Sequence, residues 1–212
     1  KDFLSLTKKG FINIHASILP KWRGAAPIQR SIMNLDKETG ISIMKIIPKL
    51  DAGPVMMKSK INITKNSNFL SLSKELSMLG ADMILKSLDL IEKNSENFID
   101  QVEREATYAE KISKKESKIE WNTEAKNIIA KINALYPNPG SWFQYKGSRL
   151  KIIKAVEVEK EGRPGEIIDK KFTIACSKNA IQILELQKEG KKSIDVSEYL
   201  KGNIIETGFN VS

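Results

Sequence analysis

Short apolar runs and helically spaced apolar residues follow one another along the first part of the chain. The runs predict strands over residues 11–15, 41–47 and 55–61, and the helical spacing predicts an amphipathic helix over residues 25–35. A longer helix is predicted over residues 69–91, because apolar residues recur there at steps of three and four. Strands that alternate with helices are typical of α/β folds, so we predict that class.

The flanks of this region carry weaker signals. Residues 1–10 have the pattern of the end of a helix, with Gly10 as its stop. Gly80 lies inside the predicted long helix and could divide it. Between residues 94 and 117 the apolar pattern weakens and charged residues accumulate, which is typical of a linker with an exposed polar surface.

A second region follows this linker. Its pattern predicts a helix over residues 122–135 and then short strands separated by glycine-bearing turns, which favours a small β-barrel. The predicted strands cover residues 141–145, 149–158, 165–169, 171–176 and 180–187. We therefore predict a first domain over residues 1–100, a linker over 101–117 and a second domain over 118–212.

Composition narrows the class of protein without identifying it. Of the 212 residues, 41% are hydrophobic, no apolar run is long enough to cross a bilayer and no apolar leader opens the chain, so we expect a cytoplasmic globular protein. The net charge of +9 is weak evidence for a nucleic-acid partner by itself. The one cysteine, Cys176, has no disulfide partner, and one cysteine with one histidine argues against a zinc site.

Three polar residues form a candidate catalytic set. Asn13 and His15 lie two residues apart at the end of a predicted strand, so their side chains are expected on one face, and Asp51 lies in the loop after the next strand. An amide N–H can stabilise an oxyanion, and an imidazole near a carboxylate can manage a proton at neutral pH. This set suits acyl transfer without a covalent enzyme intermediate.

Each of these residues also has an ordinary structural interpretation. An asparagine can cap a turn, a lone strand histidine is often a packed residue, and an aspartate before Gly53 and Pro54 is common turn chemistry. A serine triad is a poor alternative, because the chain has no Gly-x-Ser-x-Gly elbow and no second histidine. Taken together, the catalytic and structural interpretations are balanced.

Several motifs resemble the methionyl-tRNA formyltransferase family over the whole chain. They are Asn13-x-His15-x-Ser17-x-Leu19-Pro20, Arg23-Gly24-Ala25-Ala26-Pro27-Ile28-Gln29, Glu38-Thr39-Gly40, Leu50-Asp51-Ala52-Gly53 and Thr107-Tyr108-Ala109-Glu110-Lys111-Ile112-Ser113. The first, with its downstream aspartate, is shared by formyltransferases that use 10-formyltetrahydrofolate, so it indicates the reaction type. The second and the last narrow the resemblance to the tRNA enzyme.

The resemblance implies roles for the residues of the first motif. Asn13, His15 and Asp51 would be catalytic, and Ser17, Ile18, Leu19 and Pro20 would line the site of the folate co-substrate. The formyl group would pass from 10-formyltetrahydrofolate to the α-amine of methionyl-initiator tRNA, with no metal. That amine has a pKa of about 8, so the site must deal with its proton.

The resemblance also supplies a polyanionic partner for the basic residues. We expect contacts with tRNA phosphates from a cluster of basic residues that has no acidic residue within it, and from two basic residues outside that cluster. The cluster is Lys146, Arg149, Lys151 and Lys154, and the outlying positions are Arg23 and Lys114. The structural alternative is a solvated face, with Trp142 and Phe143 in a core. Lys115 and Lys118, in the linker with Lys114, could add to this surface, and Lys191 and Lys192 are weaker candidates.

Against this family the chain resembles the C-terminal half of a Rossmann-like formyltransferase domain followed by a small OB-like β-barrel. We expect a monomer that is catalytically inactive without the preceding half. One alternative is a formyltransferase that acts on glycinamide ribonucleotide or a sugar nucleotide, which would not need a basic second domain. The other is a tRNA-binding module without catalysis.

Overall fold

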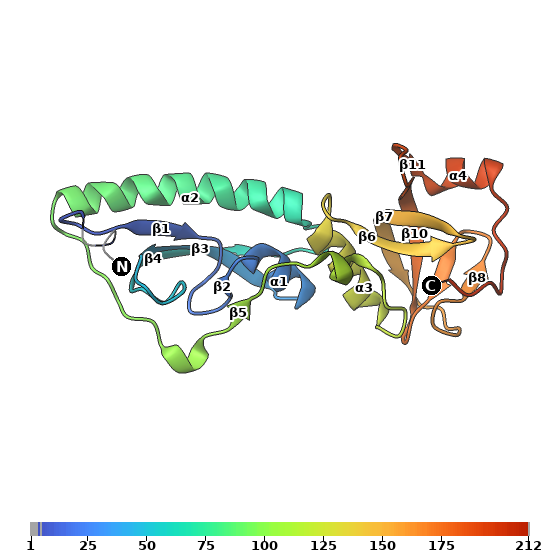
Figure 1. Ribbon diagram of the computed structural model, residues 1–212, viewed down its shortest axis with the longest axis horizontal. Helices are drawn as coiled ribbons and strands as arrows, with labels where there is room; N and C mark the ends of the chain where they lie inside the picture. The colour runs from blue at the N-terminus through green and yellow to red at the C-terminus, as the bar shows by residue number, and fades with distance from the viewer. Residues whose placement is uncertain (1–3, 5, 212) are drawn as a thin grey trace. The chain divides into compact units, whose positions relative to one another are not determined.

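The computed structural model describes residue 4 and residues 6–211 (Figure 1). The chain divides into two compact units, one formed by Lys1–Ile32 with Asp36–Ile112 and the other by Met33–Leu35 with Ser113–Ser212. Each unit has its own sheet and its own buried core. Among the described residues, no helix combines the length and the apolar character that a membrane span needs.

The first unit is built on a three-stranded sheet with the order β1-β3-β4. Its strands are β1 (Ile12–His15), β3 (Glu38–Lys45) and β4 (Val55–Asn62), and both pairs are antiparallel. Six consecutive residues of β3, from Thr39 to Met44, are buried, which matches the central position of this strand. Among the strands of the described residues, β2 (Arg23–Gly24) and β5 (Tyr108–Ala109) form the parallel pair, and Lys118 and Trp142 form an isolated parallel bridge.

Helix α2 (Phe69–Glu92) runs along one face of this sheet (Figure 1). Asn68 caps it, because its side chain accepts the Ser71 N–H at 3.0 Å while the Ser71 hydroxyl accepts the Asn68 N–H at 3.1 Å. The helix is not divided at Gly80. A Cβ there would lie 2.9 Å from a methyl of Ile14, so the glycine allows α2 to approach β1 closely.

Two predicted helical segments differ from the structure. Residues 6–9 form bends rather than a helix, and the Thr7 hydroxyl bonds to the Gly10 carbonyl at 2.9 Å; residues 1–3 and 5 lie outside the described residues. Helix α1 (Pro27–Met33) is shorter than the predicted 25–35. Its start is delayed because the N–H groups of Ala25 and Ala26 both donate to the Ala109 carbonyl.

The segment predicted as a linker contains regular structure. Besides β5, it holds two short 3-10 helices, η2 (Glu103–Glu105) and η3 (Lys114–Ser117). This segment makes hydrogen bonds to the first unit as far along as Lys111, whose main-chain oxygen accepts a hydrogen bond from Arg30 of α1. The part of it up to that residue is therefore integrated into the first unit.

The second unit contains an antiparallel sheet and two helices. The helices are α3 (Ala125–Leu135) and α4 (Val196–Gly202), and the strands are β6 (Ser141–Tyr145), β7 (Ser148–Val158), β8 (Ile167–Asp169), β9 (Thr173–Ala175), β10 (Ala180–Lys188) and β11 (Ser193–Asp195). The sheet order is β6-β7-β10-β9-β8, and β11 pairs with β10. All five predicted strands are present, whereas β11 and α4 carry patterns too short to predict.

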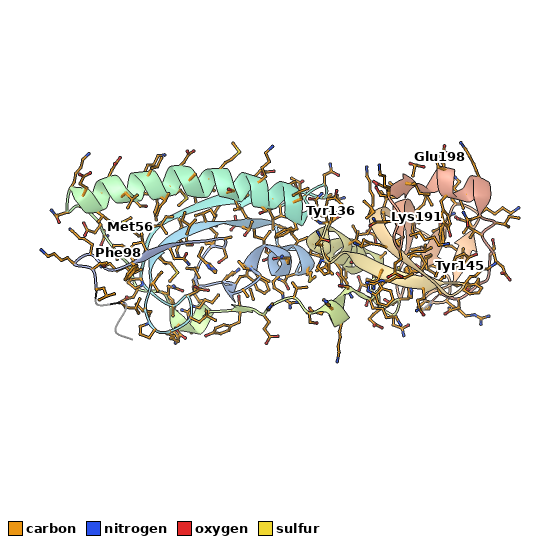
Figure 2. All side chains as sticks on the ribbon, turned by 45° about the horizontal axis from the view of Figure 1, so that its top comes forward. Met56, Phe98, Tyr136, Tyr145, Lys191 and Glu198 are labelled. Atoms are coloured by element: carbon orange, nitrogen blue, oxygen red, sulfur yellow. The ribbon has the colours of Figure 1, made fainter. Side chains whose placement is uncertain are left out.

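Aromatic side chains fill the core of the second unit. Phe143 is fully buried, with its ring centroid 5.6 Å from that of Trp121 and 6.0 Å from that of Phe172, in edge-to-face contacts. Tyr145, which lies on β6 with Phe143, also packs against Phe172 and is labelled in Figure 2. Trp142 is only partly buried, since alternate residues of β6 face opposite sides of the sheet.

Candidate active site

His15 lies at the end of β1 with a fixed ring orientation. It pairs with Ser42 on β3 and is only 5% exposed. Its Nε2 lies 2.9 Å from the main-chain oxygen of Trp22. Because a carbonyl oxygen can only accept a hydrogen bond, Nε2 carries a proton, and the remaining ring nitrogen, Nδ1, is the position that can take up another.

Asp51 faces that second nitrogen. Its Oδ2 lies 3.7 Å from His15 Nδ1, which is too long for a direct hydrogen bond but close enough for a charge interaction with a protonated imidazole. The same oxygen accepts the Gly24 N–H at 2.8 Å, and Asp51 has a left-handed backbone with φ of 44°. The structure therefore brings together the histidine and the carboxylate that the sequence placed 36 positions apart.

Asn13 completes the predicted set on the same strand. It is half-buried and opposite Met44, while Ile14, between it and His15, meets α2 on the other side. Among the described residues, the Asn13 side chain has no hydrogen-bond partner, so its amide is free to donate to a bound group. An oxyanion formed beside His15 would be such a group.

Ser42 on β3 makes two hydrogen bonds to the loop that follows β1. Its hydroxyl donates to the Ser17 carbonyl at 2.7 Å and accepts the Leu19 N–H at 3.1 Å. Ser17 and Leu19 are fully buried, and Leu19 packs with Met44. Of the four residues predicted to line a folate site, Ile18 and Pro20 are therefore the ones with exposed surface, together with the main chain of the loop.

Lys58 on β4 is a contributor that the sequence did not single out. Its Nζ donates to the main-chain oxygen of Leu19. Partial burial lowers the pKa of Lys58, and the nearby Glu105 carboxylate opposes that shift. Only the antiparallel pairing of β3 with β4 brings this lysine to the loop, so no local sequence signal could have identified it.

Arg23 requires a correction, because it is fully buried and presents no surface to a phosphate. Its Nε donates to Gln101 Oε1 at 3.1 Å, and its Nη1 to Glu103 Oε2 at 3.0 Å. Glu103 also pairs with Lys49, and hydrogen bonds from Lys49 and then Arg23 lower the pKa of Glu103. The predicted tRNA contact at Arg23 is therefore wrong for this conformation, and the side chain connects parts of the first unit.

Arg149 and Lys151 lie together in the second unit. They are two residues apart on β7, and with Lys188 of β10 they line a groove of about 290 Å³. The other lining residues are Pro139, Gln187, Glu189 and Gly190. Arg149 stacks on the ring of Trp142, with its guanidinium carbon 4.1 Å from the ring centroid. The groove therefore brings three basic side chains together, and Lys188 is the one that the sequence analysis did not single out.

The other predicted basic residues do not line this groove. Lys146 lies in the turn between β6 and β7 with φ of 48°, and it pairs with Glu206 at 3.0 Å. That hydrogen bond to Glu206 raises the pKa of Lys146. Lys114 is exposed in η3, and Lys191, labelled in Figure 2, lies just before β11.

Comparisons with known proteins define the class first. A sequence model of the formyl transferase family matches residues 1–88, and a model of the formyl transferase C-terminal domain matches residues 111–203. The structure of HypX from Aquifex aeolicus in complex with tetrahydrofolic acid superposes with a TM-score of 0.68 at 19% identity, over 89% of this chain and 34% of that one. Methionyl-tRNA formyltransferase from Clostridium thermocellum superposes with a TM-score of 0.54 at 22% identity, over 68% of this chain and 62% of that one.

Sequence relatives then define the particular family. Methionyl-tRNA formyltransferase of Pelagibacter ubique is 48% identical over 213 aligned residues, which cover 100% of this chain and 69% of the relative. The same enzyme of Bradyrhizobium diazoefficiens is 39% identical, over 97% of this chain and 67% of the relative. The chain belongs to the methionyl-tRNA formyltransferase family.

Proposed function

We propose that this chain transfers the formyl group of 10-formyltetrahydrofolate to the α-amine of methionine on initiator tRNA, for translation initiation. The observation that carries the proposal is the geometry at His15. One ring nitrogen is fixed as a donor to the Trp22 carbonyl, and the other faces the Asp51 carboxylate at 3.7 Å. The Asn13 amide lies two residues earlier on β1 and has no hydrogen-bond partner among the described residues. The motif that contains these residues is the family's signature for this reaction.

The proposed reaction assigns a role to each of these groups. The amine nitrogen attacks the formyl carbon, and the carbonyl oxygen becomes an oxyanion that accepts a hydrogen bond from the Asn13 amide. The proton released by the amine goes to Nδ1 of His15, where Asp51 stabilises the imidazolium that forms. The oxyanion then re-forms the carbonyl as the bond from carbon to the folate nitrogen breaks, and the His15 imidazolium returns its proton to that nitrogen.

We further propose that the loop of Ser17, Ile18, Leu19 and Pro20 forms one wall of the folate site. Ile18 and Pro20 would contribute apolar surface, and the main chain that Ser42 and Lys58 fix would contribute polar groups. We expect no metal, because formyl transfer to an amine from an activated formamide does not require one. We also propose a Rossmann-like first domain, a monomer and a cytoplasmic location.

The second unit is proposed as an OB-like barrel that binds the tRNA. The groove of Arg149, Lys151 and Lys188 would hold phosphates, giving affinity that falls with salt concentration. Lys151→Ala should weaken tRNA binding and reduce the salt slope by about one unit. Lys170→Ala is the matched control, since Lys170 is exposed at the opposite edge of the sheet, after β8. An unchanged slope in Lys151→Ala would remove this lysine from the interface.

The deciding experiment is formylation of methionyl-initiator tRNA with 10-formyltetrahydrofolate. It is run with the 212-residue chain and with the chain in a polypeptide of its relatives' length, because the match covers 69% of the Pelagibacter protein. His15→Ala should lower the rate by about 10²–10⁴-fold, and Asn13→Ala by about 10²-fold. Binding of tRNA without transfer would favour the binding-module alternative. Transfer to a sugar nucleotide but not to the tRNA would favour the other formyltransferase alternative.

A further inference from the structure

The chain returns to the active site after α2 and runs alongside the loops that carry the catalytic residues. This return segment, residues 99–111, begins where Ile99 and Val55 exchange main-chain hydrogen bonds at 2.8 and 2.9 Å. It ends where Arg30 bonds to the carbonyl oxygens of Glu110 and Lys111. Between these two anchors, three of its side chains bond to the loops of Asp51 and Trp22. Glu103 pairs with Lys49 and Arg23, and the other two are Gln101 and Thr107.

Gln101 holds the loop of Asp51. Its Nε2 donates to the main-chain oxygens of Asp51 and Gly53 at 2.8 and 2.7 Å. Its Oε1 accepts the Nε–H of the buried Arg23 at 3.1 Å, so both ends of the amide are bonded. Asp51 has a positive φ, which is costly for a residue other than glycine and persists only where its surroundings impose it. Gln101 is the side chain that bonds to both carbonyls of this turn.

Thr107 holds the loop that orients His15. Its hydroxyl oxygen accepts the Trp22 N–H at 2.9 Å, and its main-chain oxygen accepts the Arg23 N–H at 2.9 Å. Its N–H donates to the Pro20 carbonyl at 3.3 Å. Trp22 has φ of 60°, and its carbonyl is the group that fixes the proton on Nε2 of His15. The position of that carbonyl therefore depends on the contacts of Thr107.

We propose that Gln101 and Thr107 are positioning residues that together set the separation and orientation of His15 and Asp51. Gln101 acts on the carboxylate and Thr107 on the imidazole. Because both lie on one continuous segment anchored at each end, a shift of that segment changes the two catalytic groups together. This inference rests on the proposed formyl transfer, and it assigns a role to side chains that the reaction does not touch.

The test compares isosteric variants with a conservative one. Thr107→Val keeps the shape of the side chain and loses the oxygen, whereas Thr107→Ser keeps the oxygen. Gln101→Met removes all three hydrogen bonds without adding charge. We expect Thr107→Val and Gln101→Met to lower kcat by about 10-fold or more with KM for both substrates within about 2-fold of the parent, and Thr107→Ser to restore kcat. Lys126→Ala, which removes an exposed partner of Glu124 in the second unit, is the control and should leave kcat unchanged.

A second readout does not need activity. The chain has one histidine, so the ¹⁵N signals of its ring report which nitrogen of His15 carries the proton. We expect the Nε2–H form in the parent and a mixture of forms in Thr107→Val. If the variants lose thermal stability while kcat and the ring signals stay unchanged, the inference is overturned. The values of kcat are measured in the polypeptide of the relatives' length. If that parent polypeptide transfers no formyl group, the proposed function fails, and the ring signals of the 212-residue chain still decide whether Thr107 orients His15.

Discussion

Gly53→Ala is the substitution whose consequence the structure defines most sharply. A Cβ on Gly53 would lie 1.9 Å from the main-chain oxygen of Lys45, far inside the 3.0 Å below which real Cβ contacts are essentially never found. Lys45 cannot retreat, because its N–H is bonded to Pro54 at 2.9 Å and it belongs to β3, the central strand. The loop must therefore move by about 1 Å, a displacement that can cost about 10²-fold in rate at a catalytic group.

The displaced loop is the one that carries Asp51, and the Gly53 carbonyl itself accepts from Gln101. We therefore expect formylation by Gly53→Ala to fall about 10²-fold at a temperature well below its unfolding transition. Gly202→Ala is the control, because nothing lies within 4 Å of a Cβ there, and it should keep full activity. Activity of Gly53→Ala within about 3-fold of the parent would refute the argument that the position of this loop controls the rate.

Three further predictions concern stability and reactivity. Burial acts to raise the pKa of Asp169, but hydrogen bonds led by that from Lys160 lower this pKa overall. The ionised carboxylate therefore stabilises the fold above the unfolded-state pKa near 3.8, and this contribution is lost as pH falls through the lower folded-state pKa. Asp169→Asn should therefore cost about 1 kcal/mol at pH 7 in a denaturant titration, with the difference from the parent vanishing at the acid end. Burial raises the pKa of Cys176 to about 12, so alkylation should be slow in the native state and fast in urea, and rapid native labelling would contradict its burial. Asn68→Ala should cost about 1 kcal/mol of stability by removing the cap of α2, and an unchanged urea midpoint would show that the cap contributes nothing.

The sequence predicts elements well where periodicity is strong and poorly where distant hydrogen bonds decide. Helix α2 and strands β6 to β10 lie close to their predicted positions, because each presents a regular apolar face to a core. Helix α1 was predicted too long, because its start depends on bonds from Ala25 and Ala26 to Ala109. That carbonyl lies more than eighty positions away, so no local pattern could have included it.

In the candidate site too, the sequence predicts what depends on local residue types and fails where distant hydrogen bonds decide. The types and spacing of Asn13, His15 and Asp51 indicate their chemistry, because an amide, an imidazole and a carboxylate at these positions suit proton transfer beside an oxyanion. Arg23 was assigned to tRNA because an arginine in a polar loop carries no sign of burial, and its partners Gln101 and Glu103 are some eighty positions away.

The motif that starts at Thr107 illustrates what a sequence resemblance leaves out. As a string of residues it only helped to narrow the family, and its charged surroundings suggested a linker. In the structure, Thr107 bonds to Pro20, Trp22 and Arg23. Pro20 is the last residue of the loop proposed to bind folate, and Trp22 and Arg23 follow it closely in the sequence. A segment whose function was only to connect two domains would not need a hydroxyl at the position that accepts the Trp22 N–H. The physical requirement on this segment is therefore the geometry of His15, which is why the Thr107→Val and Thr107→Ser pair tests the role of the motif and not only that of one residue.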